Sequence, residues 1–369
     1  MSAKFRLCLV LSLLSSASAV LAQDPPAAGK GDAKAGDAAP AAKAEAPATK
    51  KGLGRGGPPL SEADIAEIAP LKDLPAWKVG LPNGEYSTGP EYPPSPEQTE
   101  RDDVPKGKII KFKMDSAESK IFPGQNAPFQ RDVAVYIPAQ NKPDSPAPFI
   151  VACDQYGLQN YKLSTILDNM IADKRLPPLV AVMIANAGPD RSYEYDTVWG
   201  KNAEFVENEV LPRVEKEAGI KLTKDPEARM TLGGSSGGIC AFSMAWFHPE
   251  LYHRVLSYSG TFVNLRRNDE YPHGGWEYPE NLISKSDKKP LRVWLHAGEK
   301  DNGATSASSA MRNWVIANKR LAEALNAKGY PYQFVFAKNS GHTPRDAISN
   351  TLPSALEFAW RGYPIEGAK

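Results

Sequence analysis

The sequence predicts an α/β protein whose open, mostly parallel sheet carries helices on both faces. Two observations from Lys108 onward support this fold class. Short apolar runs recur along the region, and most are continuous, which is typical of strands buried on both faces. Helical patterns separate these runs, and strand–helix alternation on that scale produces parallel sheets. The strands are expected at residues 131–137, 149–153, 179–185, 229–232, 255–258, 291–295 and 332–336.

Helical periodicity is clearest in two of the intervening segments. Ala203, Val206, Val210 and Val214 recur at spacings of three and four, and Pro212 predicts a bend within this helix. Residues 311–328 form a second amphipathic pattern of the same kind. Helices of this type would cover the faces of the sheet.

The first 22 residues have the pattern of a secretory signal peptide. Lys4 and Arg6 precede a short apolar stretch from Leu7 to Leu14, and the small-residue cleavage pattern ends at Ala22. The apolar stretch is too short to span a bilayer as a helix. The expected location of the mature protein is therefore secreted or periplasmic.

Two further segments precede the expected folded domain at 108–369. Residues 23–57 are rich in Ala, Lys, Pro and Gly and contain no aromatic residue, so we expect a disordered linker that is dispensable for activity. Residues 58–107 are Pro-rich and are expected to lie extended over the domain surface. A short helix is expected at 61–68, where Ser61 and Asp64 resemble a capping pattern.

Charge and cysteine content exclude several function classes. The chain carries 44 basic and 43 acidic residues, a balance that does not favour a polyanion such as nucleic acid. No apolar run after the N-terminus reaches the roughly 18 residues of a membrane span. Cys153 and Cys240 are the cysteines beyond the signal, and we expect buried thiols, with a disulfide as the alternative.

A glycine-serine turn stands between a predicted strand and a predicted helix. Within residues 231–239 the pattern G-x-S-x-G is met by Gly234, Ser236 and Gly238. This context matches the nucleophile elbow of α/β-hydrolases, where glycines permit a tight turn and the serine hydroxyl stands above the sheet. Ser236 is therefore the predicted nucleophile, and Ser235 is the alternative hydroxyl.

A serine hydroxyl needs a base, and the base needs an acid to orient it. His342 follows the last predicted strand and precedes the final helix, which is the position of the base in the chain order Ser, acid, His. Asp301 follows the strand at 291–295 and is the predicted acid, with Glu299 as the alternative. His296 is less suitable as a base because packing within its strand would hold it.

The oxyanion formed during acyl transfer needs backbone N–H donors. One is expected at Gly237, at the start of the helix that follows the serine. The other is expected from Gln155 or Tyr156, just after the strand at 149–153.

Short motifs distributed from Lys108 to Gly362 point to a known family. They are SKIFPG at 119–124, VYIPAQ at 135–140, RSYEYD at 191–196, the turn at 233–242, Gly298-x-x-Asp301 and Gly341-His342. With these motifs the chain resembles the esterase family of α/β-hydrolases that contains feruloyl, acetyl-xylan and enterochelin esterases. The resemblance implies the serine, acid and histidine at Ser236, Asp301 and His342. One departure is Asp154-Gln155, where related sequences tend to carry Asp-Gly.

Aromatic and charged side chains near these motifs are candidates for binding substrate. Aromatic faces suit sugar rings and phenolic acids, and an Arg–Glu pair can orient a polar group. Ordinary aromatic packing and a surface ion pair are the alternatives. The candidates are Tyr156, Arg191, Glu194, Tyr195, Trp276 and Trp314.

The signal, the site and the resemblance together predict a secreted serine esterase that works through an acyl-enzyme. Its expected substrates are acetyl or feruloyl esters on plant polysaccharide. A siderophore trilactone esterase and a non-catalytic binding module with the same fold are the alternatives. We expect no cofactor, no metal, no nucleic acid and no membrane partner.

Overall fold

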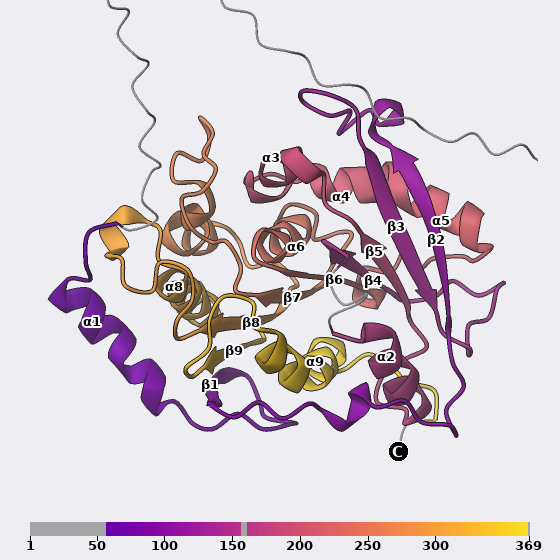
Figure 1. Cartoon of the computed structure of the whole chain (residues 1–369), viewed down its shortest axis with the longest axis horizontal. Helices are drawn as coiled ribbons and strands as arrows, with labels where there is room; N and C mark the ends of the chain where they lie inside the picture. The colour runs from indigo at the N-terminus through magenta and orange to yellow at the C-terminus, as the bar shows by residue number, and fades with distance from the viewer. Residues whose placement is uncertain (1–56, 156–160, 368–369) are drawn as a thin grey trace, which may run out of the picture. The chain divides into compact units, whose positions relative to one another are not determined.

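A nine-stranded sheet forms the centre of the protein, with strands in the order β1-β9-β8-β7-β6-β4-β5-β3-β2 (Figure 1). The computed structural model describes residues 57–155 and 161–367, so the expected signal peptide and nearly all of the expected linker lie outside the described residues. The strands are β1 (Gly84–Thr88), β2 (Lys108–Asp115), β3 (Gln130–Ile137), β4 (Phe149–Cys153), β5 (Val180–Ile184), β6 (Arg229–Gly234), β7 (Arg254–Tyr258), β8 (Arg292–Gly298) and β9 (Tyr332–Ala337).

The predicted mostly parallel sheet is confirmed. Every neighbouring pair from β1 to β5 is parallel. Only β3 breaks this direction among the described strands, since it runs antiparallel to both β5 and β2. All seven strands expected from the sequence are present, whereas β1 and β2 were not foreseen as strands.

Helices cover both faces of the sheet, as Figure 1 shows. The helices α4, α5, α6 and α8 pack on one face, and α2 and α9 pack on the other. The α-helices are α1 (Glu62–Ile68), α2 (Leu163–Ala172), α3 (Arg191–Asp196), α4 (Lys201–Phe205), α5 (Leu211–Ala218), α6 (Ser236–Phe247), α7 (Ile283–Lys285), α8 (Trp314–Ala327) and α9 (Arg345–Trp360).

Short 3-10 and π turns connect or extend these helices. They are η1 (Ala69–Asp73), η2 (Pro96–Gln98), η3 (Ser116–Glu118), η4 (Gly188–Asp190), η5 (Val206–Val210), η6 (Pro226–Ala228), η7 (Gly274–Trp276), η8 (Tyr278–Leu282) and η9 (Ser308–Ala310).

The continuous apolar strands are explained by two separate cores. In β4 the side chains of Phe149, Val151 and Cys153 join the core under α4, α5, α6 and α8. The alternating residues Ile150 and Ala152 join the core under α2 and α9. Because successive side chains of a strand point to opposite faces, a strand covered on both faces needs apolar residues at every position.

Pro212, where the sequence predicts a bend, lies at the junction between two helical forms. A π turn, η5, links α4 to α5, and Pro212 lies in the first turn of α5. Helical bonding continues through this junction, since the Leu211 N–H donates to the Val206 carbonyl, and prolines and π turns both mark irregular points of a helix. The helix ends at Gly219, whose φ of +63° closes it in the left-handed region.

Residues 57–105, which we name the N-terminal strap, run from α8 and β9 across to α2 (Figure 1). The strap contains α1, η1, β1 and η2. Ser61 and Asp64 form a complete capping box at the start of α1, as the sequence predicts. The strand β1 pairs with β9 in parallel from Gly84 to Thr88. The strap therefore adds a strand to the sheet, beyond the extended surface path that was expected.

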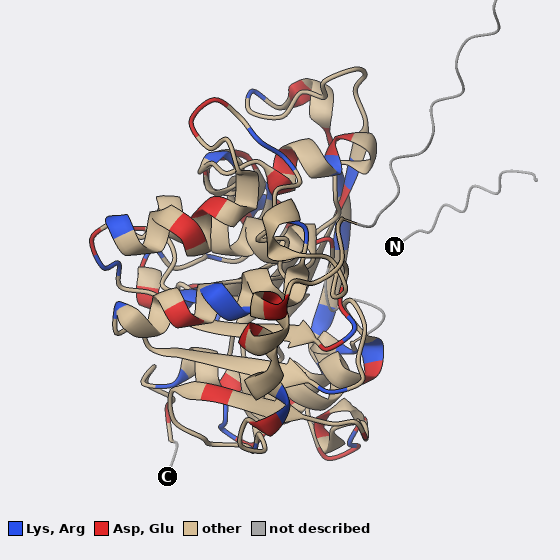
Figure 2. Cartoon of the chain, turned by 90° about the vertical axis from the view of Figure 1, so that its left-hand side faces the viewer, with Lys and Arg blue, Asp and Glu red and all other residues tan. Residues whose placement is uncertain are grey.

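Acidic and basic residues are interspersed over the side of the protein that Figure 2 shows. This distribution agrees with the net charge of +1. None of the helices in residues 57–155 and 161–367 is long and apolar enough to cross a membrane.

Candidate active site

Ser235 occupies the sharp turn between β6 and α6. Its backbone has φ 56° and ψ −125°, a strained conformation for a residue with a side chain. Ser235 is half-buried, whereas Ser236 is 4% exposed. A Cβ atom on Gly233 would lie 2.1 Å from the Gly237 carbonyl oxygen, so a side chain there would prevent the turn from closing. The chain thus forms an elbow that presents the Ser235 hydroxyl.

The imidazole of His342 joins Ser235 to a carboxylate. His342 Nε2 lies 2.8 Å from Ser235 Oγ, and His342 Nδ1 lies 2.6 Å from Asp301 Oδ1. A proton on Nδ1 that is donated to Asp301 leaves Nε2 free to accept the serine proton. The three side chains form one continuous hydrogen-bonded row.

Asp301 is fixed in place by backbone donors. Its Oδ1 accepts from the N–H of Asn302 at 2.7 Å, and its Oδ2 accepts from the N–H of Gly298 at 3.3 Å. Asp301 follows β8, and His342 follows β9, so both arrive from the carboxyl ends of neighbouring parallel strands. Open α/β sheets place their sites at this edge.

The expectation that His342 contacts Ser236 is wrong, because the imidazole is hydrogen-bonded to Ser235. The motif G-x-S-x-G occurs here in two overlapping frames, one centred on each serine. The sequence interpretation took the second frame. In the folded chain Ser236 is already the first residue of α6, and its hydroxyl points to Arg191 and Asp196.

Glu299 and His296 do not take part in this row. Glu299 accepts hydrogen bonds from Lys72 and from the backbone of Asn339. His296 is fully buried, stacks on Trp294, and has no hydrogen-bond partner on either ring nitrogen. Burial lowers the pKa of His296 to about 4, so the ring is neutral at pH 7.

The structure also differs from the sequence prediction in which backbone N–H groups are free to stabilise an oxyanion. With Ser235 at the elbow, the next residue is Ser236, and its N–H is among the first of α6, which have no carbonyl partner within the helix. Gly237, the expected donor, is one residue further along. The N–H of Gln155 donates to the Ile184 carbonyl at 2.8 Å, which rules out the expected role in this structure. Tyr156 lies outside the described residues.

A polar network borders the elbow on the side away from His342. Arg191 donates to both carboxylate oxygens of Asp154, at 2.8 and 2.6 Å, and to Ser236 Oγ at 2.8 Å. The Ser236 hydroxyl in turn donates to Asp196 at 3.0 Å. Burial raises the pKa of Asp196 to about 6, against the opposing effect of its hydroxyl donors. The sequence interpretation did not single out Asp196, because nothing in its local pattern shows that α3 approaches α6.

Of the expected substrate residues that the structure describes, Trp314 adjoins the row described above, and Arg191 adjoins the elbow through Ser236. The indole of Trp314 lies edge-on to the His342 ring, with centroids 6.0 Å apart. Glu194 is 1% exposed and pairs with the buried Arg131, so it has no surface from which to contact a substrate. Tyr195 and Trp276 are also buried, at 3% exposure each, and this contradicts their expected role as well.

Cys153 and Cys240 lie directly beneath the elbow. Both thiols are buried and free, with their sulfur atoms 3.6 Å apart. Cys153 ends β4, and Cys240 lies in the first half of α6.

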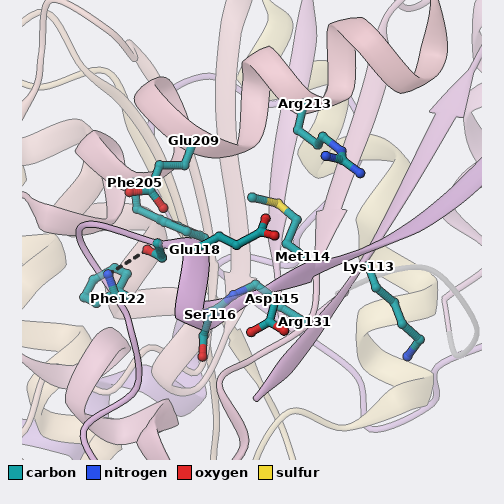
Figure 3. A pocket seen from close by; sticks show the side chains of 11 residues that line it. Lys113, Met114, Asp115, Ser116, Glu118, Phe122, Arg131, Phe205, Glu209 and Arg213 are labelled. Carbon is teal, nitrogen blue, oxygen red and sulfur yellow. Dashed lines mark hydrogen bonds between the residues drawn. The ribbon is translucent and has the colours of Figure 1, made fainter. Parts of the chain in front are cut away.

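The pocket drawn in Figure 3 lies away from the elbow. It has a volume of about 180 Å³ and is lined from β2, β3 and the α4–η5 region by residues such as Met114, Arg131, Phe205 and Glu209. None of Ser235, Asp301 and His342 lines it.

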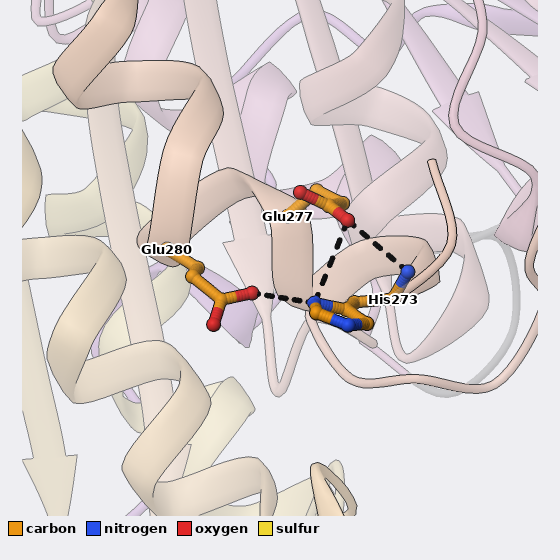
Figure 4. A group of neighbouring side chains, drawn as sticks. All are labelled: His273, Glu277 and Glu280. Carbon is orange, nitrogen blue, oxygen red and sulfur yellow. Dashed lines mark hydrogen bonds and ion pairs between the residues drawn. The ribbon is translucent and has the colours of Figure 1, made fainter. Parts of the chain in front are cut away.

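One group of side chains in the described part of the chain has the composition of a metal site. His273, Glu277 and Glu280 bring one ligand atom each within 4.8 Å of one another (Figure 4). These atoms also bond among themselves, since His273 Nδ1 lies 2.7 Å from Glu280 and 3.6 Å from Glu277. The group is therefore accounted for as an ion-paired cluster.

The mixed sheet, its two helical layers and the elbow after β6 define an α/β-hydrolase. The chain belongs to the family described as "Putative esterase", whose model matches residues 126–357. This membership makes the protein a relative of ester hydrolases.

Individual relatives include two kinds of esterase. The iron(III) enterobactin esterase of Dickeya dadantii is 25% identical over 294 residues, which cover 77% of this chain and 61% of that protein. This chain thus spans less than two thirds of that relative. An enterobactin esterase structure from Shigella flexneri has a TM-score of 0.54 at 19% identity and covers 70% of this chain and 61% of its own.

Ferulic acid esterases share the same fold over nearly their whole length. One solved structure has a TM-score of 0.53 at 18% identity and covers 69% of this chain and 99% of its own. The ferulic acid esterase of Anaeromyces mucronatus has a TM-score of 0.53 at 14% identity and covers 73% of this chain and 96% of its own.

Proposed function

We propose that the protein hydrolyses carboxylic esters through an acyl-enzyme formed on Ser235. The observation that carries the proposal is the hydrogen-bonded row of Ser235, His342 and Asp301 at the carboxyl edge of the sheet. Membership in an esterase family agrees with it.

The geometry assigns each group a step. His342 Nε2 removes the Ser235 proton as Oγ attacks the ester carbonyl, and Asp301 stabilises the imidazolium that forms. The tetrahedral intermediate collapses when His342 returns that proton to the leaving alcohol. A water molecule, deprotonated by the same nitrogen, then attacks the acyl-enzyme and releases the carboxylic acid and free Ser235.

The Ser236 N–H is the proposed donor to the oxyanion. It belongs to the residue after the nucleophile and lies at the positive end of α6, where negative charge is stabilised. A second donor is proposed from the loop after β4. Because the N–H of Gln155 is engaged by Ile184, Tyr156 is the candidate left from the sequence interpretation.

Acetyl or feruloyl esters of plant polysaccharide are the proposed substrates. In support, the ferulic acid esterase structures align over 96–99% of their own length, so this chain has the extent of a whole enzyme of that kind. The neutral balance of charge also suits an uncharged polysaccharide better than a polyanion.

A siderophore trilactone is the second candidate substrate. It is favoured by the enterobactin esterase of Dickeya dadantii, the more similar of the relatives described here at 25% identity. The enterobactin esterases are longer, and 59–63% of their chains align with this protein.

A panel of three esters tests these proposals. Methyl ferulate, acetylated xylan and a ferric catecholate trilactone are each incubated with the protein and with a Ser235→Ala variant, and acid release is measured by chromatography. Preferred turnover of the first two supports the polysaccharide substrate, and preferred turnover of the trilactone replaces it. Absence of turnover on all three and on p-nitrophenyl acetate would favour a non-catalytic binding module.

We also propose that the protein is exported. The basic residues, apolar stretch and cleavage pattern within residues 1–22 support this proposal. Mass spectrometry of the protein recovered from the periplasm or medium should give a chain that begins at Gln23.

A further inference from the structure

The N-terminal strap lies outside residues 126–357, to which the family model corresponds. It nevertheless contacts both loops that carry the row described above. We infer that the strap holds Asp301 and His342 in the positions from which they form the hydrogen-bonded row with Ser235. Tyr92 and Lys72 are the positioning residues that we assign to this role. The inference rests on the proposed esterase activity.

The first contacts hold the loop between β8 and α8, which contains Asp301. The N–H of Ala307 donates to the Pro58 carbonyl at 2.7 Å, and the N–H of Ser308 donates to Asp64 at 3.3 Å. Glu67 of α1 accepts two hydrogen bonds from Arg320 of α8, at 2.8 and 2.7 Å. The helix α1 is therefore attached both to this loop and to the helix that follows it.

Glu299 connects the strap to both loops at once. Its Oε1 lies 2.8 Å from Lys72 Nζ of the strap, and its Oε2 accepts from the N–H of Asn339 at 2.7 Å. Glu299 stands two residues before Asp301, and Asn339 stands three residues before His342. The hydrogen bond from Lys72 and the one from the Asn339 backbone lower the pKa of Glu299, so the carboxylate is charged at pH 7.

The second set of contacts holds the exit of β9. The N–H of Lys338 donates to the Thr88 carbonyl at 2.9 Å, and the Lys338 carbonyl accepts from the Tyr92 hydroxyl at 2.6 Å. Both backbone groups of Lys338 are thus bonded to the strap. This is the point from which the chain turns toward His342.

That turn contains two residues with backbone φ angles in the left-handed region. Asn339 has φ 56° and Thr343 has φ 44°, and a β-branched residue such as Thr343 is rarely found in the left-handed region. Such a backbone is unfavourable above all for Thr343, and it persists only when its surroundings hold it. The bonds to Lys338 and Asn339 supply such a restraint on the N-terminal side of His342.

Positioning matters because His342 must serve as acid as well as base. A displacement of about 1 Å in a catalytic group can lower a rate by a factor on the order of 100. An alkyl alcohol must be protonated by His342 as it leaves, whereas p-nitrophenolate leaves without a proton. A displaced imidazole should therefore slow alkyl esters more than p-nitrophenyl esters.

Tyr92→Phe tests the inference, with Tyr86→Phe as the matched control. Within the part of the chain that the structure describes, the Tyr86 hydroxyl bonds only to the carbonyls of Pro82 and Asn83 of the strap, at 3.3 and 3.5 Å. For Tyr92→Phe we expect kcat on an alkyl ester such as methyl ferulate to fall about tenfold at unchanged KM. The loss on p-nitrophenyl acetate should be smaller, about threefold, because only the base steps of His342 are then slowed. Tyr86→Phe should match wild type on both esters.

Lys72→Met provides a second test at a site too exposed to affect folding, since the Lys72 side chain is 65% exposed. We expect the same selectivity with a smaller loss, about threefold on the alkyl ester, because exposed ion pairs are weak. Lys72→Arg should restore the rate, and Lys78→Met in the same strap should have no effect.

Wild-type alkyl-ester kcat in both Tyr92→Phe and Lys72→Met would overturn the inference. An equal loss on both esters would also overturn it, because that pattern indicates general damage to the fold. Failure of the proposed function is seen separately, as activity that persists in Ser235→Ala.

Discussion

Replacing each serine of the elbow by alanine should separate the nucleophile from its neighbour. In Ser235→Ala the His342 imidazole loses the hydroxyl 2.8 Å from Nε2, and no other hydroxyl is hydrogen-bonded to that nitrogen in the described residues. Loss of a nucleophile of this kind typically lowers kcat by a factor on the order of 10⁴–10⁶. We therefore expect turnover to fall to the background rate while the protein stays folded.

Ser236→Ala removes a different set of contacts. It deletes the hydrogen bond from Arg191 at 2.8 Å and the one to Asp196 at 3.0 Å, while the Ser236 backbone N–H is kept. A hydrogen bond to a charged group contributes about 1.5–3 kcal/mol, and a buried group left without its partner costs about 1–3 kcal/mol. We expect a loss of about 2–3 kcal/mol in the free energy of unfolding and a kcat within about tenfold of wild type.

The assay combines kinetics with covalent labelling. Turnover of p-nitrophenyl acetate is measured for wild type and both variants, and urea unfolding gives the free energy of each. A fluorophosphonate should modify the peptide that contains Ser235 in wild type and in Ser236→Ala, and should not modify Ser235→Ala. Activity of more than a few per cent in Ser235→Ala, with an inactive but folded Ser236→Ala, would refute the assignment and restore the sequence interpretation.

Three further outcomes follow from the described contacts. Asp301→Asn should lower kcat by up to about 10⁴-fold, because an amide that donates to Nδ1 holds His342 in the wrong tautomer. The value of kcat is measured with p-nitrophenyl acetate, and a loss of less than about tenfold would contradict the prediction. Asp196 has its pKa raised from 3.8 to about 6, so the folded state binds the extra proton and the free energy of unfolding falls as pH rises through the window from about 4 to 6. Asp196→Asn should remove this decline, so that the variant's free energy of unfolding at pH 8, compared with that at pH 4, is about 2–3 kcal/mol more favourable than in wild type. Urea unfolding at the two pH values measures this difference. An unchanged dependence of the free energy of unfolding on pH would show that Asp196 is not its cause. Glu194→Ala leaves the guanidinium of Arg131 buried without its partner, so the free energy of unfolding should fall by about 3–5 kcal/mol. A loss of less than about 1 kcal/mol in urea unfolding would contradict this.

The sequence predicted the layered architecture well because burial on both faces leaves a direct trace in composition. Mostly continuous apolar runs marked the six strands from β4 to β9, and alternation of Val133, Val135 and Ile137 marked β3. The strand β1 left no such trace, since its residues GEYST are only partly buried and lie among prolines. Its pairing depends on the free edge of β9, whose residues stand 249 positions further along the chain, as the register Gly84↔Gln333 shows.

The candidate site was predicted in its acid and base but not in its serine. The chain order placed Asp301 and His342 after neighbouring strands, and their 2.6 Å contact agrees with that prediction. Two adjacent serines flanked by two pairs of glycines satisfy the same motif twice, so spacing alone could not choose between Ser235 and Ser236. The choice depends on where the strand ends and the helix begins. Element boundaries of this kind are set by tertiary packing.

Side-chain direction was the other limit of the sequence interpretation. Glu194 and Tyr195 belong to the same short motif as Arg191, yet they point into the core while Arg191 reaches the elbow. Glu194 and Tyr195 stand three and four residues after Arg191, on the same side of α3, and the Arg191 guanidinium lies over the Tyr195 ring. Burial of this side by the rest of the fold decides which of the three side chains reaches the elbow, and the motif does not record that burial.

The position of β1 at one end of the sheet also bears on how the protein behaves at high concentration. Without β1, the strand β9 would become the edge, and its residues from Tyr332 to Ala337 are all buried and mostly apolar. An apolar edge strand with unpaired backbone groups readily pairs with another copy of itself and aggregates. β1 replaces that edge with a short strand followed by Pro90, which has no N–H to offer a ladder. At the opposite end, β2 exposes Lys111 and Lys113, whose charges repel an approaching copy. Each end of the sheet thus resists pairing with the strands of a neighbouring copy.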